Sequence, residues 1–166
     1  MTILERLLRH DAWTTRALLV LASGLGDAEL DLEFDVGHRT LRRTFVHIVA
    51  NMECWCDLMT ARPQRWAGRE TRLAESVAGL IERLDRIADE LLALGGRVTD
   101  EGREDDEFVD YLDDPPARKP LGAGLVHVAT HGMHHRAQCL NMLRHLGVSP
   151  LPPSSVVEWM IENGAV

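Results

Sequence analysis

Five of the eight histidines in this chain lie between His127 and His145. A neutral imidazole is a common ligand of zinc and of other borderline divalent ions. Side chains four residues apart on a helix lie on the same face, one turn above the other, so His131 and His135 are able to bind one ion together. The same spacing relates His127 to His131, but His131 and His135 lie nearer the apolar stripe of the helix. The segment therefore predicts a divalent-metal site built on His131 and His135.

A third ligand is expected from a facing helix, because two imidazoles on one helix seldom suffice for a tight site. His47 is the candidate, since it borders the apolar stripe of another helical segment and can face the interior. Three neutral imidazoles bind Zn²⁺, Ni²⁺ or Fe²⁺ and leave positions for water, substrate or a thiolate. Such an open site is typical of a catalytic metal centre.

The remaining histidines are weaker candidates for metal ligands. In a histidine-rich segment, a spacing of four residues between two histidines also arises by accident. Gln138, one turn beyond His135, is able to orient a ligand or to bind substrate. Cys54 lies two turns from His47, about 10 Å along the helix axis, which argues against shared ligation. We expect outer, entrance or solvated positions for His127, His134 and His145, and no specific role for His10 and His38.

Neither the acids near His47 nor the cysteines suggest further catalytic groups. Glu53 and Asp57 lie toward the charged arc of the same helix, so no catalytic role is assigned to them. The cysteines are too few for a disulfide scaffold and lack the spacing of a zinc knuckle. We expect them to be reduced thiols; they are Cys54, Cys56 and Cys139.

Four long segments with helical periodicity must position these side chains. The expected helices cover residues 2–23, 40–60, 71–94 and 120–146. Thr2 and Thr40 are suited to cap two of them, and the third is expected to stop at Gly95-Gly96. A short last helix begins at Ser154 or Ser155 and passes through Trp159 and Met160. These elements predict an all-α fold, an antiparallel four-helix bundle with a short C-terminal helix, in a single domain over residues 1–166.

The acidic balance of the chain limits its partners. Eighteen Lys and Arg residues face 26 Asp and Glu residues, a formal net charge of −8, which disfavours nucleic acid and an anionic membrane surface. Residues 100–114 hold nine carboxylates and one arginine. We expect a solvated loop there, with Phe108-Val109 and Tyr111-Leu112 pinning a short hairpin; repelling anions or binding a cation is the alternative. No apolar run is long enough to span a bilayer and no signal peptide is evident, so a cytoplasmic protein is expected.

Three stretches of the chain resemble the DinB-like proteins. They are residues 10–16 (HDAWTTR), residues 45–49 (FVHIV) and, above all, residues 127–138 (HVATHGMHHRAQ). This group includes the YfiT-like metal-dependent hydrolases and is similar to the thiol-dependent S-transferases of bacteria. The resemblance implies a four-helix bundle, usually dimeric, that holds a divalent metal between three histidines. Carried over by position, the implied ligands are His47, His131 and His135, the same three that the helix faces favour.

The leading hypothesis is a metal-dependent enzyme that acts on a small molecule, either as a thiol S-transferase or as a hydrolase, with a low-molecular-weight thiol as one possible partner. The alternative is a non-catalytic, stress-related helical dimer in which the ion is structural and ties two helices together. A third reading is a dimeric scaffold with an incidental histidine cluster. A homodimer is implied by the family, and the wide apolar arc of the helix over residues 40–60 favours it as well.

Overall fold

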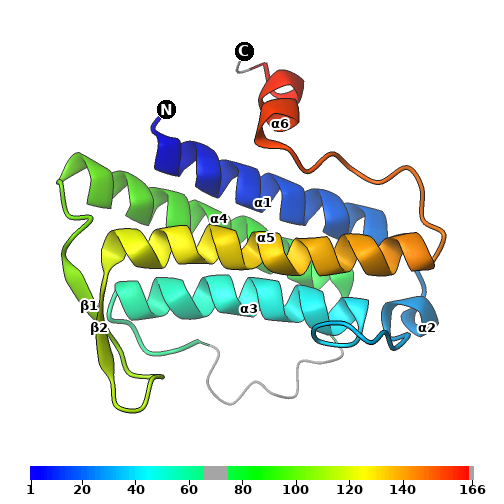
Figure 1. Cartoon of the computed structure of the whole chain (residues 1–166), viewed down its shortest axis with the longest axis horizontal. Coiled ribbons are helices and arrows are strands. Elements are labelled where there is room, and N and C mark those ends of the chain that lie inside the picture. Colours follow the sequence, from blue (N-terminus) through cyan, green and yellow to red (C-terminus); the bar gives the residue numbers. More distant parts are fainter. Residues whose placement is uncertain (66–74, 165–166) are drawn as a thin grey trace.

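Four long helices make up most of the computed structural model, which describes residues 1–65 and 75–164 (Figure 1). Their bounds are α1 Ile3–Ala22, α3 Leu41–Met59, α4 Val77–Asp100 and α5 Leu121–His145. Two short helices complete the set, α2 Asp27–Leu30 and α6 Val156–Glu162. As predicted, Thr2 and Thr40 cap α1 and α3 through their hydroxyl oxygens, which accept backbone N–H groups left free at the helix start. The expectation of a mostly helical chain is confirmed.

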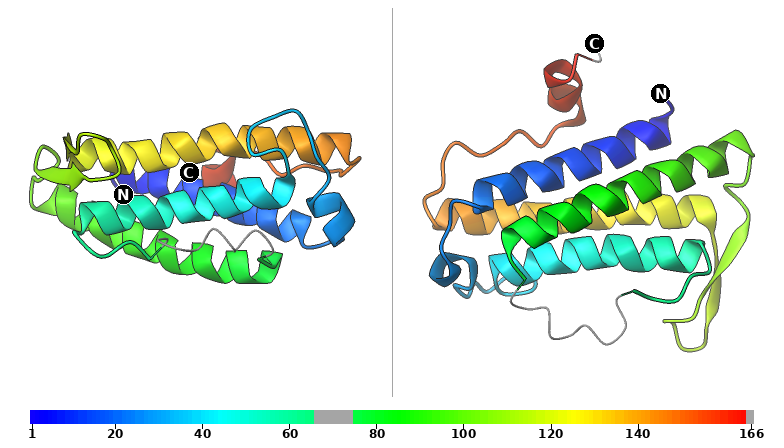
Figure 2. Two further views of the ribbon diagram at one scale, coloured as in Figure 1. Left: turned by 90° about the horizontal axis from the view of Figure 1, so that it is seen from below. Right: turned by 180° about the vertical axis from the view of Figure 1, so that it is seen from behind.

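The long helices pack side by side, with α1 and α3 each in contact with both α4 and α5 (Figures 1 and 2). α1 and α5 run in one direction and α3 and α4 in the other. Helices α3 and α4, which follow each other in the chain, are therefore parallel, and the predicted antiparallel order fails at this pair. α3 and α5 are antiparallel neighbours, and this pairing brings His47 and the histidines of α5 into reach of one another.

A two-stranded antiparallel sheet stands between α4 and α5 in the chain, formed by β1 Glu107–Asp110 and β2 Ala117–Pro120. The buried ring of Phe108 packs edge-on against Trp55 of α3, so Phe108 does pin the hairpin to the helices. Tyr111 and Leu112 do not, because the register of the strands places them beyond β1 and leaves them exposed.

Helix α4 passes through Gly95 and Gly96 and ends at Asp100, so the expected stop at these glycines is wrong. Gly95 is buried against α1, where a Cβ would stand 2.9 Å from Leu8 Cδ1. The glycine thus serves a close helix–helix approach, and the following turn adds buried Val98 to the core. The predicted start of this helix at residue 71 lies outside the described residues; Ser76 caps the helix that is seen.

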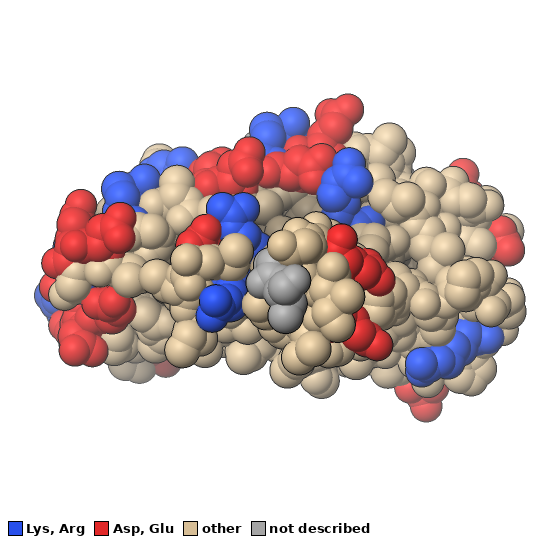
Figure 3. All heavy atoms as spheres, turned by 90° about the horizontal axis from the view of Figure 1, so that it is seen from above, with Lys and Arg blue, Asp and Glu red and all other residues tan. Residues whose placement is uncertain are grey.

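Helices α5 and α6 have the predicted bounds to within a few residues. The turn after α5 contains Gly147 at a φ of +75°, and Ser155 caps α6, which buries Trp159. Among the described residues no helix is both long and apolar enough to cross a membrane. Acidic and basic side chains lie interspersed over the face that Figure 3 shows, with few charges toward the end where α5 leads into α6.

The two carboxylates on the charged arc of α3 are buried and paired with arginines. Glu53 is 5% exposed and accepts two hydrogen bonds from Arg83 of α4, at 3.0 and 2.6 Å. Asp57 is 1% exposed and accepts one from Arg65 Nη2 at 2.6 Å. Buried charges persist when they are paired in this way. Helix periodicity alone does not reveal these arginines, which come from other segments.

The wide apolar arc of α3 is also covered within the chain. Its core residues pack in the interior shared with α4 and α5, and β1 covers a further part. The breadth of this arc therefore requires no second chain, although the sequence suggested one. The large apolar side chains that remain exposed on the long helices include Val126 and Met133, both on α5.

One buried ion pair links α1 to α5. Arg136 is 6% exposed and its Nη1 donates to the carboxylate of Asp11, which is 1% exposed, and to the hydroxyl of Thr15 at 3.1 Å. The Thr15 hydroxyl in turn donates to the Asp11 carbonyl at 2.8 Å. Because neither charge has ready access to water, each depends on the other for compensation.

We expect Asp11→Asn to lower the free energy of unfolding by about 3–5 kcal/mol, because it leaves the Arg136 guanidinium buried without a counter-charge. Urea unfolding followed by circular dichroism measures this. The matched control is Asp85→Asn, which breaks the exposed pair with Arg16 and should cost less than about 1 kcal/mol. If both variants lose the same free energy of unfolding, the buried Asp11–Arg136 pair contributes no more to stability than the exposed pair does.

Candidate metal centre

The three predicted ligands come together where α3 faces α5. His47 lies two turns into α3, and His131 and His135 lie one turn apart on α5. Nε2 of His131 is 3.2 Å from Nε2 of His47 and 3.2 Å from Nε2 of His135. Two nitrogens bound to one tetrahedral zinc ion at its usual bond length lie roughly 3.4 Å apart. These separations therefore fit three ligands of a single ion.

Two separate hydrogen bonds cannot satisfy both ring contacts of His131 Nε2 at once. Nδ1 of His135 lies 2.9 Å from Gln138 Oε1, which accepts, so the proton is assigned to Nδ1 and Nε2 keeps a lone pair. Nε2 of His131 carries either a proton or a lone pair, so it cannot donate to His135 and also accept from His47. Nδ1 of His131 is buried without a partner among the described residues. A cation between the three Nε2 atoms satisfies all of their lone pairs.

Burial keeps these imidazoles neutral. It lowers the pKa of His47 to about 3, with His38 and His135 as further causes. It lowers the pKa of His131 to about 4, with His135 next in importance. The pKa of His135 is lowered as well, mainly by burial. Because only the neutral ring has a free lone pair, these residues can bind a cation at neutral pH with little competition from protons.

Gln138 connects the site to its surroundings. Its Oε1 accepts from His135 Nδ1, and its Nε2 donates to Nε2 of His134 at 3.0 Å. A histidine ligand normally donates its second ring N–H to such a partner, which fixes the ring and its tautomer. The prediction that Gln138 is able to orient a ligand agrees with this geometry.

His38, to which the sequence assigned no role, lies beside the predicted ligands. Nitrogens of His38, His47 and His135 all fall within 4.8 Å of one another, a grouping able to hold a metal ion. The ring centroid of His38 is 3.9 Å from that of His47 and 5.1 Å from that of His135. The only sequence signal was its position two residues before Thr40, the cap of the helix that carries His47. That position does not reveal whether the chain folds back over the helix.

The other histidines lie outside this group. His127 packs on Trp55, with ring centroids 4.3 Å apart, and stands 5.3 Å from the His131 ring. His134 and His145 are exposed, in line with the expectation of solvated positions. His10 is buried and its Nε2 lies 3.0 Å from the carbonyl oxygen of Ser154, so it holds the segment before α6 against α1.

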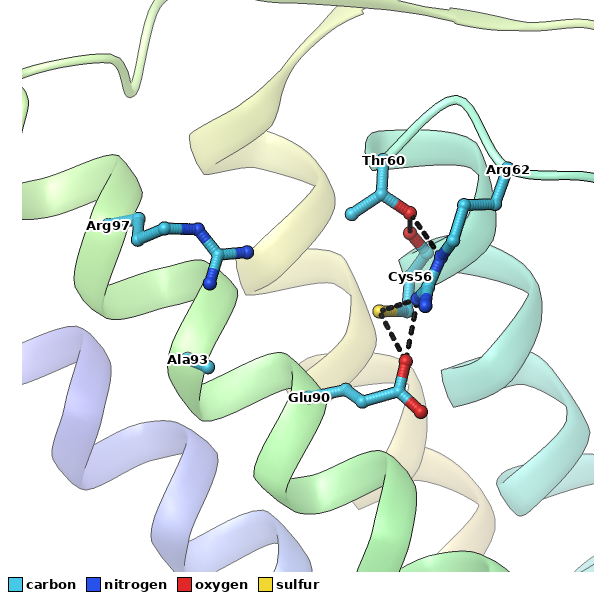
Figure 4. A pocket seen from close by; sticks show the side chains of 6 residues that line it. All are labelled: Cys56, Thr60, Arg62, Glu90, Ala93 and Arg97. Atoms are coloured by element: carbon cyan, nitrogen blue, oxygen red, sulfur yellow. Dashed lines mark hydrogen bonds and ion pairs between the residues drawn. The ribbon is translucent and has the colours of Figure 1, made fainter.

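A separate cavity of about 300 Å³ lies between α3 and α4 (Figure 4). The Cys56 thiol faces it, 3.3 Å from Arg62 Nη2, while Arg62 also donates to Glu90 at 2.6 Å. Burial raises the pKa of the Cys56 thiol, which keeps it protonated and weakly nucleophilic. All three cysteines are free thiols, as expected. Arg62 and Glu90 of this cavity are already paired with each other, and it offers no reactive group comparable to the histidine cluster.

The sequence matches the DinB family over residues 1–160. The match covers nearly the whole chain, so the protein belongs to the DinB family. The matched range includes all three segments that carry the resemblance and every histidine of the cluster. No curated protein matches the chain.

We expect Gln138→Ala to weaken divalent-metal binding by roughly 10–100-fold, because His135 loses the acceptor that fixes its ring and tautomer. Titration of metal-free protein with Zn²⁺ against a competing chelator measures the dissociation constant. Asn141→Ala, an exposed change on the same helix, is the matched control and should bind as the wild type does. Unchanged affinity in Gln138→Ala would mean that this hydrogen bond does not support the site.

Proposed function

We propose that this DinB-family protein is a metal-dependent enzyme that binds one divalent ion through His47, His131 and His135 and acts on a small molecule. The observation that carries the proposal is the approach of the three Nε2 atoms, with both contacts of His131 at 3.2 Å. The ion is of the borderline type that imidazoles prefer, Zn²⁺, Ni²⁺ or Fe²⁺. The reaction proposed is thiol S-transfer or hydrolysis.

A divalent ion in this position supplies Lewis acidity, which lowers the pKa of a water or thiol that binds to it. The protein's own part is to hold three neutral imidazoles in place. Gln138 keeps the proton of His135 on Nδ1, so Nε2 stays free for binding. The proposed ligands are three neutral imidazoles, so they add no negative charge to that of the ion.

The second candidate function is the structural one, in which the ion ties α3 to α5. The observation that favours it is His38, since four protein ligands are typical of a structural zinc site. Against it stands the packing, because α3 and α5 already share a buried core that includes Phe45, Leu125 and Val128. A fold with such a core does not require an ion to hold these helices together, which makes the catalytic proposal the stronger one.

The family resemblance extends the proposal to a homodimer in the cytoplasm whose partner is a small molecule, with a low-molecular-weight thiol as the favoured class. For the dimer, the uncharged exposed surface of α5 around Val126 and Met133 is the available contact face. This face lies away from the packed interior, so association there would leave the four-helix packing intact.

Elemental analysis of tag-free protein tests the site. We expect about one divalent ion per chain in the wild type and in His145→Ala, which changes an exposed histidine of α5, and little or none in His131→Ala, which loses the shared ligand. The absence of a stoichiometric ion in the wild type, even after metals are added back, would end the proposal. Stripping the ion with a chelator separates the two candidates: without a catalytic ion the protein should stay folded and helical at about 25 °C with a lowered melting temperature, whereas without a structural ion it should lose its helical circular dichroism.

The S-transfer reaction has its own test. Metal-loaded wild-type protein should consume a cellular thiol together with an electrophile, and His131→Ala should fall to the uncatalysed rate while keeping its helical circular dichroism. The His145→Ala variant, loaded in the same way, should match the wild type. Equal rates in the wild type and in His131→Ala would remove S-transfer and leave hydrolysis as the reaction to be screened.

A further inference from the structure

His38 reaches the candidate site from a different kind of element than the other histidines. His47, His131 and His135 are held by helices, where the backbone fixes their relative positions. His38 lies in the link between α2 and α3, two residues before the helix cap. Its ring lies over that of His47 at a centroid distance of 3.9 Å and an interplanar angle of 33°. It covers the side of the cluster that the two long helices leave open.

The distances place His38 at the limit of ligation. The nitrogens of His38, His47 and His135 lie within 4.8 Å of one another, whereas ligands of one ion are separated by roughly 3.4 Å in tetrahedral geometry and at most about 4.2 Å when they lie opposite each other. The Nε2 atoms around His131 already meet the shorter of these distances. His38 thus lies beside the position proposed for the ion, next to two of its three ligands.

The link that carries His38 has a shape set by its own hydrogen bonds and by contacts with α5, where the ring centroid of Phe34 lies 6.0 Å from that of His145. Gly37 and Arg39, on either side of His38, both have positive φ, +49° and +70°. The Phe34 amide donates to the Arg39 carbonyl at 2.7 Å, which closes the link on itself. Gly37 lies so close to Gln138 that a Cβ there would overlap the Oε1 atom. The amide that orients His135 thus also sets the position of the link.

His38 is chemically suited to ligation, because its pKa is lowered by burial and by His135 and its ring is neutral at pH 7. It is also half-buried, so solvent reaches its side of the cluster. Three of the four rings are carried by long packed helices, whereas His38 is carried by the short link before α3.

We propose that His38 is a displaceable fourth ligand, which occupies the open coordination position in the resting protein and gives it up to an incoming thiol. The exchange is balanced: the thiol loses its S–H proton to solvent, its sulfur takes the vacated position, and the His38 nitrogen regains a free lone pair. This inference rests on the proposed function, since it presumes an ion on His47, His131 and His135. A displaceable His38 explains how a site with four nearby imidazoles is still able to bind substrate.

Cobalt substitution of the full-length protein tests the inference through absorption spectra. Visible Co²⁺ bands report coordination number and ligand type, and a sulfur ligand adds a charge-transfer band in the near ultraviolet. We expect wild type and His38→Ala each to bind about one Co²⁺ per chain, with different visible spectra and roughly tenfold weaker binding in the variant. Circular dichroism checks the fold, and Asn141→Ala, an exposed change on α5, is the control that should behave as the wild type does.

Titration with 2-mercaptoethanol then tests displacement. Because no ligand must leave in His38→Ala, this variant should saturate at roughly tenfold lower thiol concentration than the wild type, and both should reach the same final spectrum. A wild-type spectrum that thiol leaves unchanged, while it alters that of His38→Ala, would make His38 a permanent ligand and overturn the inference.

The cobalt experiment also separates this inference from the proposed function. If His38→Ala matches the wild type in Co²⁺ affinity and spectrum, while His131→Ala fails to bind, His38 is no ligand and only this inference is overturned. If the wild type itself binds no Co²⁺, or if His131→Ala binds as well as the wild type, the three-histidine proposal is wrong. The proposal for His38 is then wrong as well, because it depends on that site.

Discussion

The buried pair between Asp11 and Arg136 sets the rotation of α5 about its own axis. Arg136 follows His135 directly in the chain, and one residue on a helix turns the side chain by about 100°. With Arg136 held toward α1 by Asp11 and Thr15, His135 is turned toward α3. Gly132 lies against the same pair, where a Cβ would crowd the Asp11 carboxylate. One face of α5 therefore serves the contact with α1, and the adjacent face carries the histidines.

Within residues 1–65 and 75–164, the group of side chains placed to hold a metal ion consists of histidines alone. Acids are abundant in this chain, but those of α3 that are most deeply buried, Glu53 and Asp57, are engaged by Arg83 and Arg65. Burial, and after it the neighbouring rings, lowers the pKa of His47 and His131, so these imidazoles remain neutral, while the Gln138 amide accepts from His135. A cluster of neutral nitrogens with few hydrogen-bond partners is suited to a divalent cation, and the ion would retain most of its charge for polarising a bound substrate.

Much of the local structure could be predicted because it depends on neighbouring residues. The caps at Thr2 and Thr40 follow from the need of free N–H groups for an acceptor, and the periodicity of apolar residues fixed the cores of α1, α3 and α5. The stop expected at Gly95-Gly96 failed because a glycine at a helix end and a glycine at a helix crossing look alike in sequence. The contact with Leu8, far away in the chain, decides between them.

By itself, the sequence determined that His131 and His135 share a helix face, because a spacing of four residues places two side chains on one face of any helix. It also identified His47 as the histidine of a second long helix that is able to join them. Tertiary structure decided which groups meet. It made α3 and α5 antiparallel neighbours, buried the carboxylates of α3 against arginines, and folded the link over the cluster so that His38 lies beside His47. Those outcomes depend on contacts between residues distant in the chain, for which one sequence carries no periodic or local signal.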